Sequence, residues 1–546
     1  MSAADSSTSR DRQGAAAPTP VPLTQIVDHS SRSLAVAARG RVWVPLLAVA
    51  GVVALFTVGL GRRELVSSHE ARAAQNAQRM LDTGEWGLPV LFDGRVDLQK
   101  PPGYYWLVAA AGWANGGVVT EFTARLPAAL AGLLTVALVY GWLRREGRPV
   151  AALVAALTLA TAGHFTAISR TARIDVPLTA VVACALVAFY RGTTTNEAGE
   201  PTAVRRRVSG ASPAALRRSA RLASFLLAAL AAAVGVLLKG PVALALVGPA
   251  AVAWLMVKPR GGGLPVPAAL LGVAVVLAVT APWFLWANGA TGGEFVRVFF
   301  WHHNVERFAG TSPTLASHPA WYYLPRFAAD FLPWTPALAL LTWWAVRAGS
   351  WRADPLFRFG AVWCVTMFAV LSAAQFKRAD YLLPLYPGAA VVLGCAAERW
   401  LAARPDPRTV RRAGWAFALV LAGVVAAWGV MAAVVEPAEE AREGKRAFAE
   451  FIRSRAPAPE PVLVFRAESH LLSFHLGVPQ SNRVEWHDLA AFLAEPGPRF
   501  VVMSAEYVYA AGEIVKTRRL VEVGRLEQFT GGRPPKSLVF LRTADD

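Results

Sequence analysis

Charged residues are scarce in this chain. Only 17% of its 546 residues are Asp, Glu, Lys or Arg, whereas soluble proteins average about 25%. The shortage excludes an ordinary cytosolic enzyme, a disordered chain and a nucleic-acid-binding module. Cysteine is also rare, with three residues that each lie inside an apolar segment and form no CxxC pair: Cys184, Cys364 and Cys395. We therefore expect neither a disulfide framework nor redox chemistry.

Apolar residues make up 55% of the chain and occur in long segments. A segment of about 20 apolar residues can cross the hydrocarbon core of a membrane. We expect about eleven such spans, at residues 42–60, 124–143, 149–167, 175–191, 221–238, 241–257, 265–286, 322–346, 357–373, 381–398 and 413–435. A further apolar run at 104–117 is too short to span, and we predict an interfacial or re-entrant helix there.

The net charge of +18 is distributed unevenly. If the N-terminus is cytoplasmic, all the predicted inner loops are basic, as the positive-inside rule requires. These loops are residues 144–148, 192–220, 258–260, 347–356 and 399–412. An odd number of spans then places the C-terminal part on the outer side.

Composition divides the chain into three regions. Residues 1–40 are rich in Ala, Ser, Thr and Pro, which is typical of a flexible cytoplasmic tail. Residues 41–436 form the predicted transmembrane domain, with a long first outer loop at 61–121. Residues 437–546 have shorter apolar runs, which predict a small α/β domain with a helix at 438–455 and strands near 461–466, 499–503 and 537–541.

The first outer loop carries polar residues that suit chemistry. His69, Glu70 and Arg72 fall on a predicted helix, although Glu70 also completes a capping box with Ser67. Lys100 precedes two prolines that fix the backbone. A lysine on such a rigid element suits a phosphate, and a snorkelling lysine at the membrane interface is the alternative.

Other predicted outer positions repeat this combination. Asp175 begins a span, where an acid also complements the helix dipole, and Arg378 and Asp380 follow Lys377. The positive-inside rule predicts few outer cations, yet several lie there: Arg72, Lys100, Arg173, Lys239, Arg307 and Lys377. We interpret them as a site for an anionic headgroup, with a nearby acid as general base. The sequence neither requires nor excludes a divalent metal, because the pair His302-His303 lacks the second His of HExxH.

Several motifs together resemble the polytopic GT-C glycosyltransferases. They are ML-x-TG-x-W…KPP…YW in the first loop, ARLP at 124–127, KGP at 239–241, then HNVERF, WYYLPRFAADFLPW and YLLPLYP. The similarity covers residues 42–400 and is greatest to the aminoarabinose (4-amino-4-deoxy-L-arabinose) transferases of lipid A, with the protein O-mannosyltransferases more distant. It implies an all-α polytopic membrane protein of GT-C type, in a bacterial inner membrane, with its site on the periplasmic side.

The resemblance also implies roles for individual residues. Lys100 matches the lysine that binds the carrier phosphate, Arg72 matches an arginine of the first-loop helix, and Arg307 matches an arginine near the phosphate. We assign these three to the donor-phosphate set, together with Lys239 and Lys377. Asp175 matches the acid of the second outer loop. His69-Glu70 stands where the family has an Asp-Glu pair, and Gln99 stands where it has an acid. The catalytic base therefore stays open between Glu70, Asp175 and His69.

The resulting prediction is an integral membrane glycosyltransferase. It would transfer a sugar from a polyprenyl-phosphate-linked donor to a lipid, glycan or protein acceptor, with no nucleic-acid partner. The alternative is a transporter or flippase for lipid-linked glycans, or a protein that only binds the carrier. The chain shows no obvious internal repeat, and its polar residues gather at one face, which disfavours transport.

Overall fold

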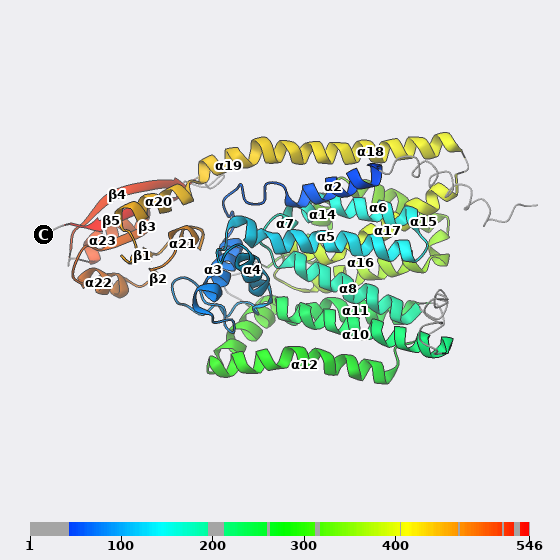
Figure 1. Cartoon of the computed structure of the whole chain (residues 1–546), viewed down its shortest axis with the longest axis horizontal. Helices are drawn as coiled ribbons and strands as arrows, with labels where there is room; N and C mark the ends of the chain where they lie inside the picture. The colour runs from blue at the N-terminus through cyan, green and yellow to red at the C-terminus, as the bar shows by residue number, and fades with distance from the viewer. Residues whose placement is uncertain are drawn as a thin grey trace, which may run out of the picture.

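The computed structural model describes residues 43–194, 212–258, 263–311, 317–404, 406–467, 470–515, 518–528 and 536–544. The tail predicted at residues 1–40 lies outside these ranges, as does most of the predicted inner loop 192–220. Figure 1 shows a bundle of long helices with a smaller sheet-containing domain at one end. We call the end of the bundle that faces this domain the domain end.

Seven helical segments of the described part are long and apolar enough to cross a membrane, or eight if one bent pair forms a single span. They are α5 (Glu121–Arg145), α8 (Asp175–Thr194), α10 (Pro213–Lys239), α12 (Val266–Ala290), α16 (Pro355–Ala373), η4 with α17 (Ala379–Leu385 and Tyr386–Ala402) and α18 (Pro407–Val430), which continues through η5 (Met431–Val435) into α19 (Glu436–Glu443). Two shorter apolar helices, α2 (Trp43–Thr57) and α11 (Val242–Val257), lie at two further predicted spans. The chain is therefore a multi-pass membrane protein, and the count of eleven stays a prediction.

Two predicted continuous spans are broken. The span at 149–167 forms α6 (Pro149–Thr161) and α7 (Gly163–Ser169), which are bent by 63°. The span at 322–346 forms α14 (Tyr323–Asp330) and α15 (Thr335–Arg347), because Pro333 has no N–H and disfavours helix at the residue before it. The two breaks meet, since the Gly163 N–H donates to the Leu332 carbonyl at 2.9 Å.

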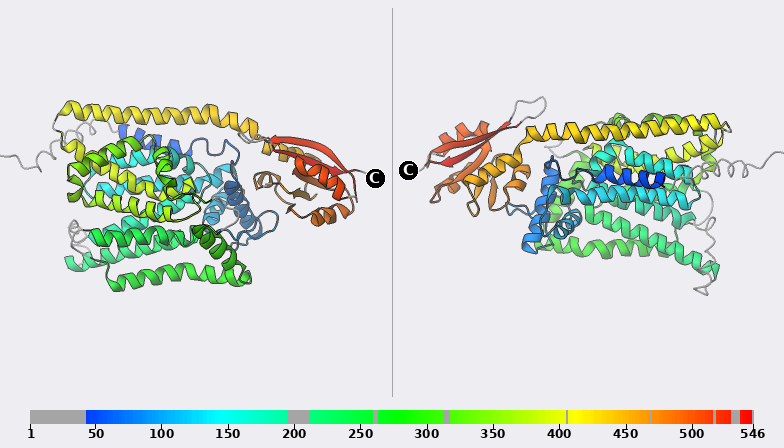
Figure 2. Two further views of the ribbon diagram at one scale, coloured as in Figure 1. Left: turned by 180° about the vertical axis from the view of Figure 1, so that it is seen from behind. Right: turned by 45° about the horizontal axis from the view of Figure 1, so that its top comes forward.

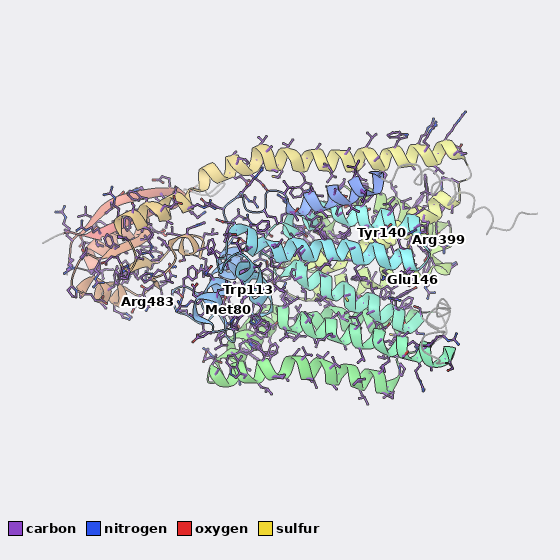
Figure 3. All side chains as sticks on the ribbon, viewed as in Figure 1. Met80, Trp113, Tyr140, Glu146, Arg399 and Arg483 are labelled. Carbon is purple, nitrogen blue, oxygen red and sulfur yellow. The ribbon has the colours of Figure 1, made fainter. Side chains whose placement is uncertain are left out.

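Short elements cover the domain end. The first loop contains α3 (Ser68–Thr83) and α4 (Gly103–Ala114), and α4 stands where the interfacial or re-entrant helix is predicted. The remaining short elements at this end are η1 (Val296–Glu306), α13 (Arg307–Ala309) and η2 (Ala320–Tyr322), whereas η3 (Ser350–Ala353) lies at the opposite end, beside Arg399. In Figure 3, Met80 and Trp113 lie at the domain end, whereas Glu146 and Arg399 lie at the opposite end.

The two outermost long helices lie on opposite sides of the bundle. α18 and α12 flank it in Figure 1, and both views of Figure 2 keep them apart. α18 has none of its most apolar window buried, and α12 has 11% buried. Their apolar side chains therefore face outward, as lipid-facing helices require.

The C-terminal domain is a five-stranded mixed sheet with helices. Its strands, in the order β2-β1-β3-β5-β4, are β1 (Val462–Phe465), β2 (Gln480–Arg483), β3 (Phe500–Ser504), β4 (Leu520–Gln528) and β5 (Lys536–Thr543). β2, β1 and β3 are parallel, and β5 and β4 complete the sheet antiparallel. The helices are α20 (Lys445–Arg455), α21 (His470–Leu476), α22 (Trp486–Ala494), η6 (Ala505–Tyr507) and α23 (Val508–Ile514).

Three strands were predicted and two were missed. β1, β3 and β5 are apolar and buried, whereas β2 is polar and β4 carries several charged residues, so neither edge strand gives an apolar signal. The predicted helix 438–455 is divided into α19 and α20 at Gly444, whose φ of 60° only glycine adopts easily.

Candidate active site

A pocket lies at the domain end, between the first loop, the start of α8, the end of α10, α13 and η4. It is lined by His69, Ala73, Lys100, Tyr104, Tyr105, Ala172, Arg173, Ile174, Asp175, Lys239, Arg307, Arg378 and Tyr381. Five of the eight predicted site residues are therefore brought together: His69, Lys100, Asp175, Lys239 and Arg307. Glu70, Arg72 and Lys377 are not among the lining residues.

Local sequence places the two lysines together. Lys100 precedes the Pro101-Pro102 turn, which leads directly into α4. A Cβ on Gly103 would lie 2.6 Å from the Leu237 carbonyl oxygen, so only glycine lets the start of α4 contact the end of α10 this closely. Because Lys239 is the last residue of α10, this contact brings Lys239 beside Lys100.

Asp175 and Lys239 form an ion pair in the pocket. Asp175 is the first residue of α8, and its Oδ1 accepts a hydrogen bond from Lys239 Nζ. The same Nζ lies 4.4 Å from the centre of the Tyr381 ring. Asp175 is the one carboxylate among the described lining residues, so a negative charge in this pocket comes from α8 alone.

Lys100 lies in strongly positive surroundings. Burial, followed by the charges of Lys239 and Arg307, lowers the pKa of Lys100 to about 7. The ammonium group is therefore close to losing its proton at neutral pH. A bound phosphate would restore the charged form, because an opposite charge nearby favours it.

Arg307 also has hydrogen-bonding capacity to spare. Its guanidinium lies 5.6 Å from the centre of the Phe376 ring. Its Nε is buried and has no hydrogen-bond partner among the described residues. A buried donor of this kind is costly unless it is paired, so an anion in the pocket would satisfy it.

His69 is uncharged at neutral pH. Burial, followed by the charges of Arg173 and Arg378, lowers the pKa of His69 to about 3. An imidazole with so low a pKa is a weak proton acceptor. Its place in the pocket lining and its low pKa suit a neutral hydrogen-bonding group better than a general base.

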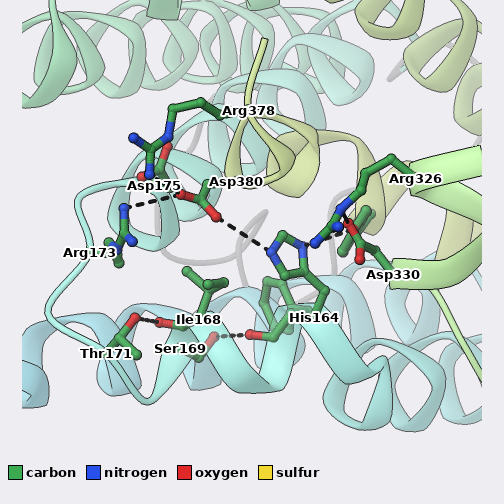
Figure 4. A network of polar contacts seen from close by, with 12 residues as sticks. His164, Ile168, Ser169, Thr171, Arg173, Asp175, Arg326, Asp330, Arg378 and Asp380 are labelled. Carbon is green, nitrogen blue, oxygen red and sulfur yellow. Dashed lines mark hydrogen bonds and ion pairs between the residues drawn. The ribbon is translucent and has the colours of Figure 1, made fainter. Parts of the chain in front are cut away.

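Two further arginines line the pocket: Arg173, which we counted among the outer cations without assigning it a role, and Arg378, which was not predicted as a site residue. Arg173 and Arg378 share Asp380, with N–O distances of 3.1 and 3.3 Å (Figure 4). On its other side Asp380 lies 3.5 Å from His164 Nε2, and His164 Nδ1 lies 3.7 Å from Asp330. The sequence signal that points to Arg173 is its predicted outer position, two residues before Asp175. His164 had none, because it lies inside a span that was predicted to be continuous.

Glu70 is a buried structural group, and its geometry does not support a base role. It is fully buried, and Arg125 Nε donates to its Oε1 at 2.9 Å. The N–H groups of Ala172 and Val66 donate to its two oxygens at 2.9 and 2.8 Å. Burial alone would raise the pKa of Glu70, but Arg125 and these hydrogen bonds lower it overall. The carboxylate thus fastens α3 to α5 and to the loop before α8.

Arg72 is also occupied outside the pocket. Its guanidinium pairs with Asp97 through two nitrogens and donates to Gln99 Oε1 at 2.5 Å. Asn76 Nδ2 donates to the same Asp97 at 3.0 Å. These contacts hold the first loop against α3, so the guanidinium of Arg72 stabilises the loop structure.

Lys377 points away from the pocket. Its Nζ donates to the carbonyl oxygen of His318 at 3.0 Å and to that of Ala374. The neighbouring Arg378 supplies the pocket cation that we predicted at Lys377. Lys377 and Arg378 are adjacent, but successive side chains point in different directions, so Arg378 lines the pocket and Lys377 does not.

The described residues contain no group of three or more His, Cys, Asp or Glu side chains that could hold a metal ion. His302 of the His302-His303 pair has its Nδ1 2.7 Å from Glu306, one turn later. His303 is held by η1 near the pocket cations, and burial together with Arg307 and Lys100 lowers its pKa to about 3.

The amino-acid sequence is similar to known transferases. Residues 46–289 match the family model described as dolichyl-phosphate-mannose-protein mannosyltransferase. The undecaprenyl phosphate-alpha-4-amino-4-deoxy-L-arabinose arabinosyl transferase of Pseudomonas paraeruginosa is 32% identical over 359 residues, which are 66% of this chain and 60% of the relative. That of Pectobacterium carotovorum is 30% identical over 407 residues, which are 70% of this chain and 65% of the relative. The chain thus spans less than two thirds of the length of these relatives.

The fold is that of a solved bacterial protein. ArnT from Cupriavidus metallidurans bound to undecaprenyl phosphate has a TM-score of 0.70 at 23% identity, covering 91% of this chain and 98% of that one. Its apo state has the same TM-score at 24% identity. The candidate spans and the bacterial relatives indicate a multi-pass inner-membrane protein. The resemblance seen in the motifs is therefore confirmed, and the transmembrane part of this chain has the sequence features and the fold of the ArnT-like GT-C glycosyltransferases.

Proposed function

We propose that this protein is an integral membrane glycosyltransferase. It would transfer a sugar from a polyprenyl-phosphate-linked donor to a lipid, glycan or protein acceptor. One observation supports this most: five cationic side chains line one pocket around a single carboxylate, Asp175. They are Lys100, Arg173, Lys239, Arg307 and Arg378. Such an excess of positive charge suits the phosphate of the donor and stabilises it as the leaving group.

Asp175 is the proposed base. As the acceptor hydroxyl oxygen bonds to the anomeric carbon, the bond from that carbon to the phosphate oxygen breaks. The hydroxyl proton passes to Asp175, and the electron pair leaves with the polyprenyl phosphate. Lys239 holds the Asp175 carboxylate in place through the ion pair, while Lys100 and Arg307 stabilise the departing phosphate.

Lys100 provides the direct test. Replacing it with alanine should lower the rate of sugar transfer by about 100-fold or more, because one electrostatic contact to the developing charge is lost. The assay uses purified full-length protein in detergent and a polyprenyl-phosphate sugar. Arg62→Ala is the matched control, since Arg62 is an exposed first-loop cation outside the pocket. Unchanged turnover in Lys100→Ala would remove this lysine from the site.

The transport alternative has no support from the comparisons, which are all with transferases or their fold. Detergent-solubilised protein distinguishes the two functions, because an enzyme transfers sugar with no bilayer to cross. Binding of the carrier without transfer to any acceptor would favour a protein that only binds.

We further propose that the pocket and the C-terminal domain face the periplasm and that the N-terminus is cytoplasmic. Basic loops lie at the end opposite the pocket, as the positive-inside rule requires. A cysteine at Trp113, which is 74% exposed at the domain end, should react with an impermeant maleimide in intact cells. A cysteine at Arg145, at the other end of α5, should react only after lysis.

A further inference from the structure

We propose that the pocket selects a donor whose sugar carries no ammonium group, so that the transferred sugar is neutral or acidic. This inference rests on the proposed function and specifies its donor class. The relatives named above are transferases of an amino sugar. The charges around this pocket favour a different class.

The charges that face the pocket are strongly unbalanced. Five cationic side chains line it, against one carboxylate, Asp175. The next acid outward is Asp380, which pairs with Arg173 and Arg378 from behind (Figure 4). Counting Asp380 as well, five positive charges face two negative ones. The single negative charge of a donor phosphodiester leaves an excess of positive charge.

The neighbouring ion pairs do not change this balance. Glu70 pairs with Arg125 behind α3, and Asp97 pairs with Arg72 on the first loop. Each pair is neutral as a whole, and neither acid lines the pocket. The excess positive charge therefore acts on whatever enters the pocket.

The one carboxylate of the described lining already has a cationic partner. Asp175 is held by Lys239, and Asp380 is held by two arginines. An ammonium group needs such acceptors when it leaves water, because an unpaired buried charge is costly. Residues 312–316, which the structure does not describe, contain no acidic residue in the sequence.

The ionisable groups of the pocket respond to the same field. Lys100 has a pKa of about 7, lowered by burial and by its cationic neighbours. His69 has a pKa of about 3 for related reasons. A pocket that disfavours the charged forms of its own lysine and histidine also disfavours a cationic sugar. Neutral His69 can instead exchange hydrogen bonds with a sugar hydroxyl.

Matched donors test this inference. The purified full-length protein in detergent is titrated with undecaprenyl phosphate-linked L-arabinose, with its 4-amino-4-deoxy counterpart and with bare undecaprenyl phosphate. At a pH of about 6.5 the amine is charged, and the hydroxyl sugar should bind at least tenfold more tightly than the amino sugar. His69→Asp should lower this preference at least fivefold, because it adds a carboxylate to the pocket wall. His69→Asn, which adds no charge, should keep the preference.

The outcomes separate this inference from the proposed function. Equal or tighter binding of the amino sugar by the natural protein overturns the inference and leaves the transferase assignment standing. An unchanged preference in His69→Asp, with the variant still folded and binding bare carrier, shows that charge is not the cause and also overturns it. Failure of the natural protein to bind any of the three lipids overturns the proposed function, and the inference with it.

Discussion

At the scale of single residues, hydrogen-bond partners and burial distinguish two acids that the sequence places at the same outer face of the membrane, Glu70 and Asp175. Glu70 and Asp175 both fall at predicted outer positions, and motif spacing did not distinguish their roles. Glu70 is fully buried, and its carboxylate accepts hydrogen bonds from one arginine and from two backbone N–H groups. Asp175 has one lysine partner and faces the pocket. The number and kind of partners therefore favour Asp175 over Glu70 as the proposed base.

Glu70→Gln should destabilise the protein. The variant removes the negative charge that pairs with the buried Arg125, whose other partners are the neutral carbonyl oxygens of Leu60, Arg63 and Glu64. Breaking a buried ion pair from one side costs about 3–5 kcal/mol, so the thermal unfolding temperature in detergent should fall clearly. Asp175→Asn loses a single lysine partner at the pocket, so it should lower the unfolding temperature less than Glu70→Gln and should abolish transfer. The reverse pattern would contradict this assignment of roles.

Lys100 makes donor binding dependent on pH. With a pKa of about 7, the lysine loses its charge as the pH rises through neutrality. Because the donor phosphodiester does not titrate in this range, its affinity should fall by roughly tenfold between about pH 6 and pH 8.5. Lys100→Arg should remove most of this dependence, since arginine stays charged. Titrations with labelled donor measure both, and a flat profile in the natural protein would show that the charge of Lys100 does not contribute to binding.

At the scale of elements, long apolar segments are predictable and breaks within them are not. α5, α8, α10 and α12 match their predicted spans, because hydropathy over about 20 residues decides them. The bend between α6 and α7 depends on a contact with Leu332, some 170 residues later in the chain. The sequence around residue 163 gives no signal of a contact with a residue so far along the chain. The bend nevertheless places His164 beside Asp380, so the missed break and the missed residue have one cause.

Asp380 should position the two arginines of the pocket. Asp380→Asn weakens the partner shared by Arg173 and Arg378, while both arginines remain charged. We expect KM for the donor to rise by about tenfold with a smaller change in kcat, as lost alignment affects binding of the phosphate first. Asp380→Glu should recover part of the affinity. A fall in unfolding temperature with unchanged KM would point to a purely structural role.

At the scale of the whole molecule, sequence reasoning named five of the residues that line the pocket but not the others. Five predicted residues meet in one pocket because the ends of α8 and α10 and the first loop converge there. Arg72 and Lys377 lie outside the lining, because the fold brings each a partner elsewhere: Asp97 for Arg72 and the His318 carbonyl for Lys377. The resemblance supplied most of these five residues, because family motifs mark positions that the fold brings together. The docking of the C-terminal domain had no sequence signal.

That domain is fastened directly to the first loop. The Arg446 guanidinium of α20 pairs with Glu121 at the start of α5. The backbone N–H of Arg446 donates to Glu64 Oε1 at 3.1 Å. Gln75 of α3 donates to the His470 carbonyl at 2.8 Å, and Leu471 and Phe474 pack on the apolar cluster of α3 and α4. The helix that carries His69 is thus supported from the domain side.

Loosening this docking should therefore affect the pocket. Arg446→Glu places two acids together and should speed hydrogen exchange in α21 and α3 by roughly fivefold, since a partly exposed ion pair contributes about 1 kcal/mol. The double variant with Glu121→Arg should restore slow exchange by reversing the pair. Arg525→Ala is the control, because it removes an exposed pair with Glu522 on β4, away from the interface. If α3 exchanges equally in all four proteins while α21 responds, the domain is docked but does not support the first-loop helix.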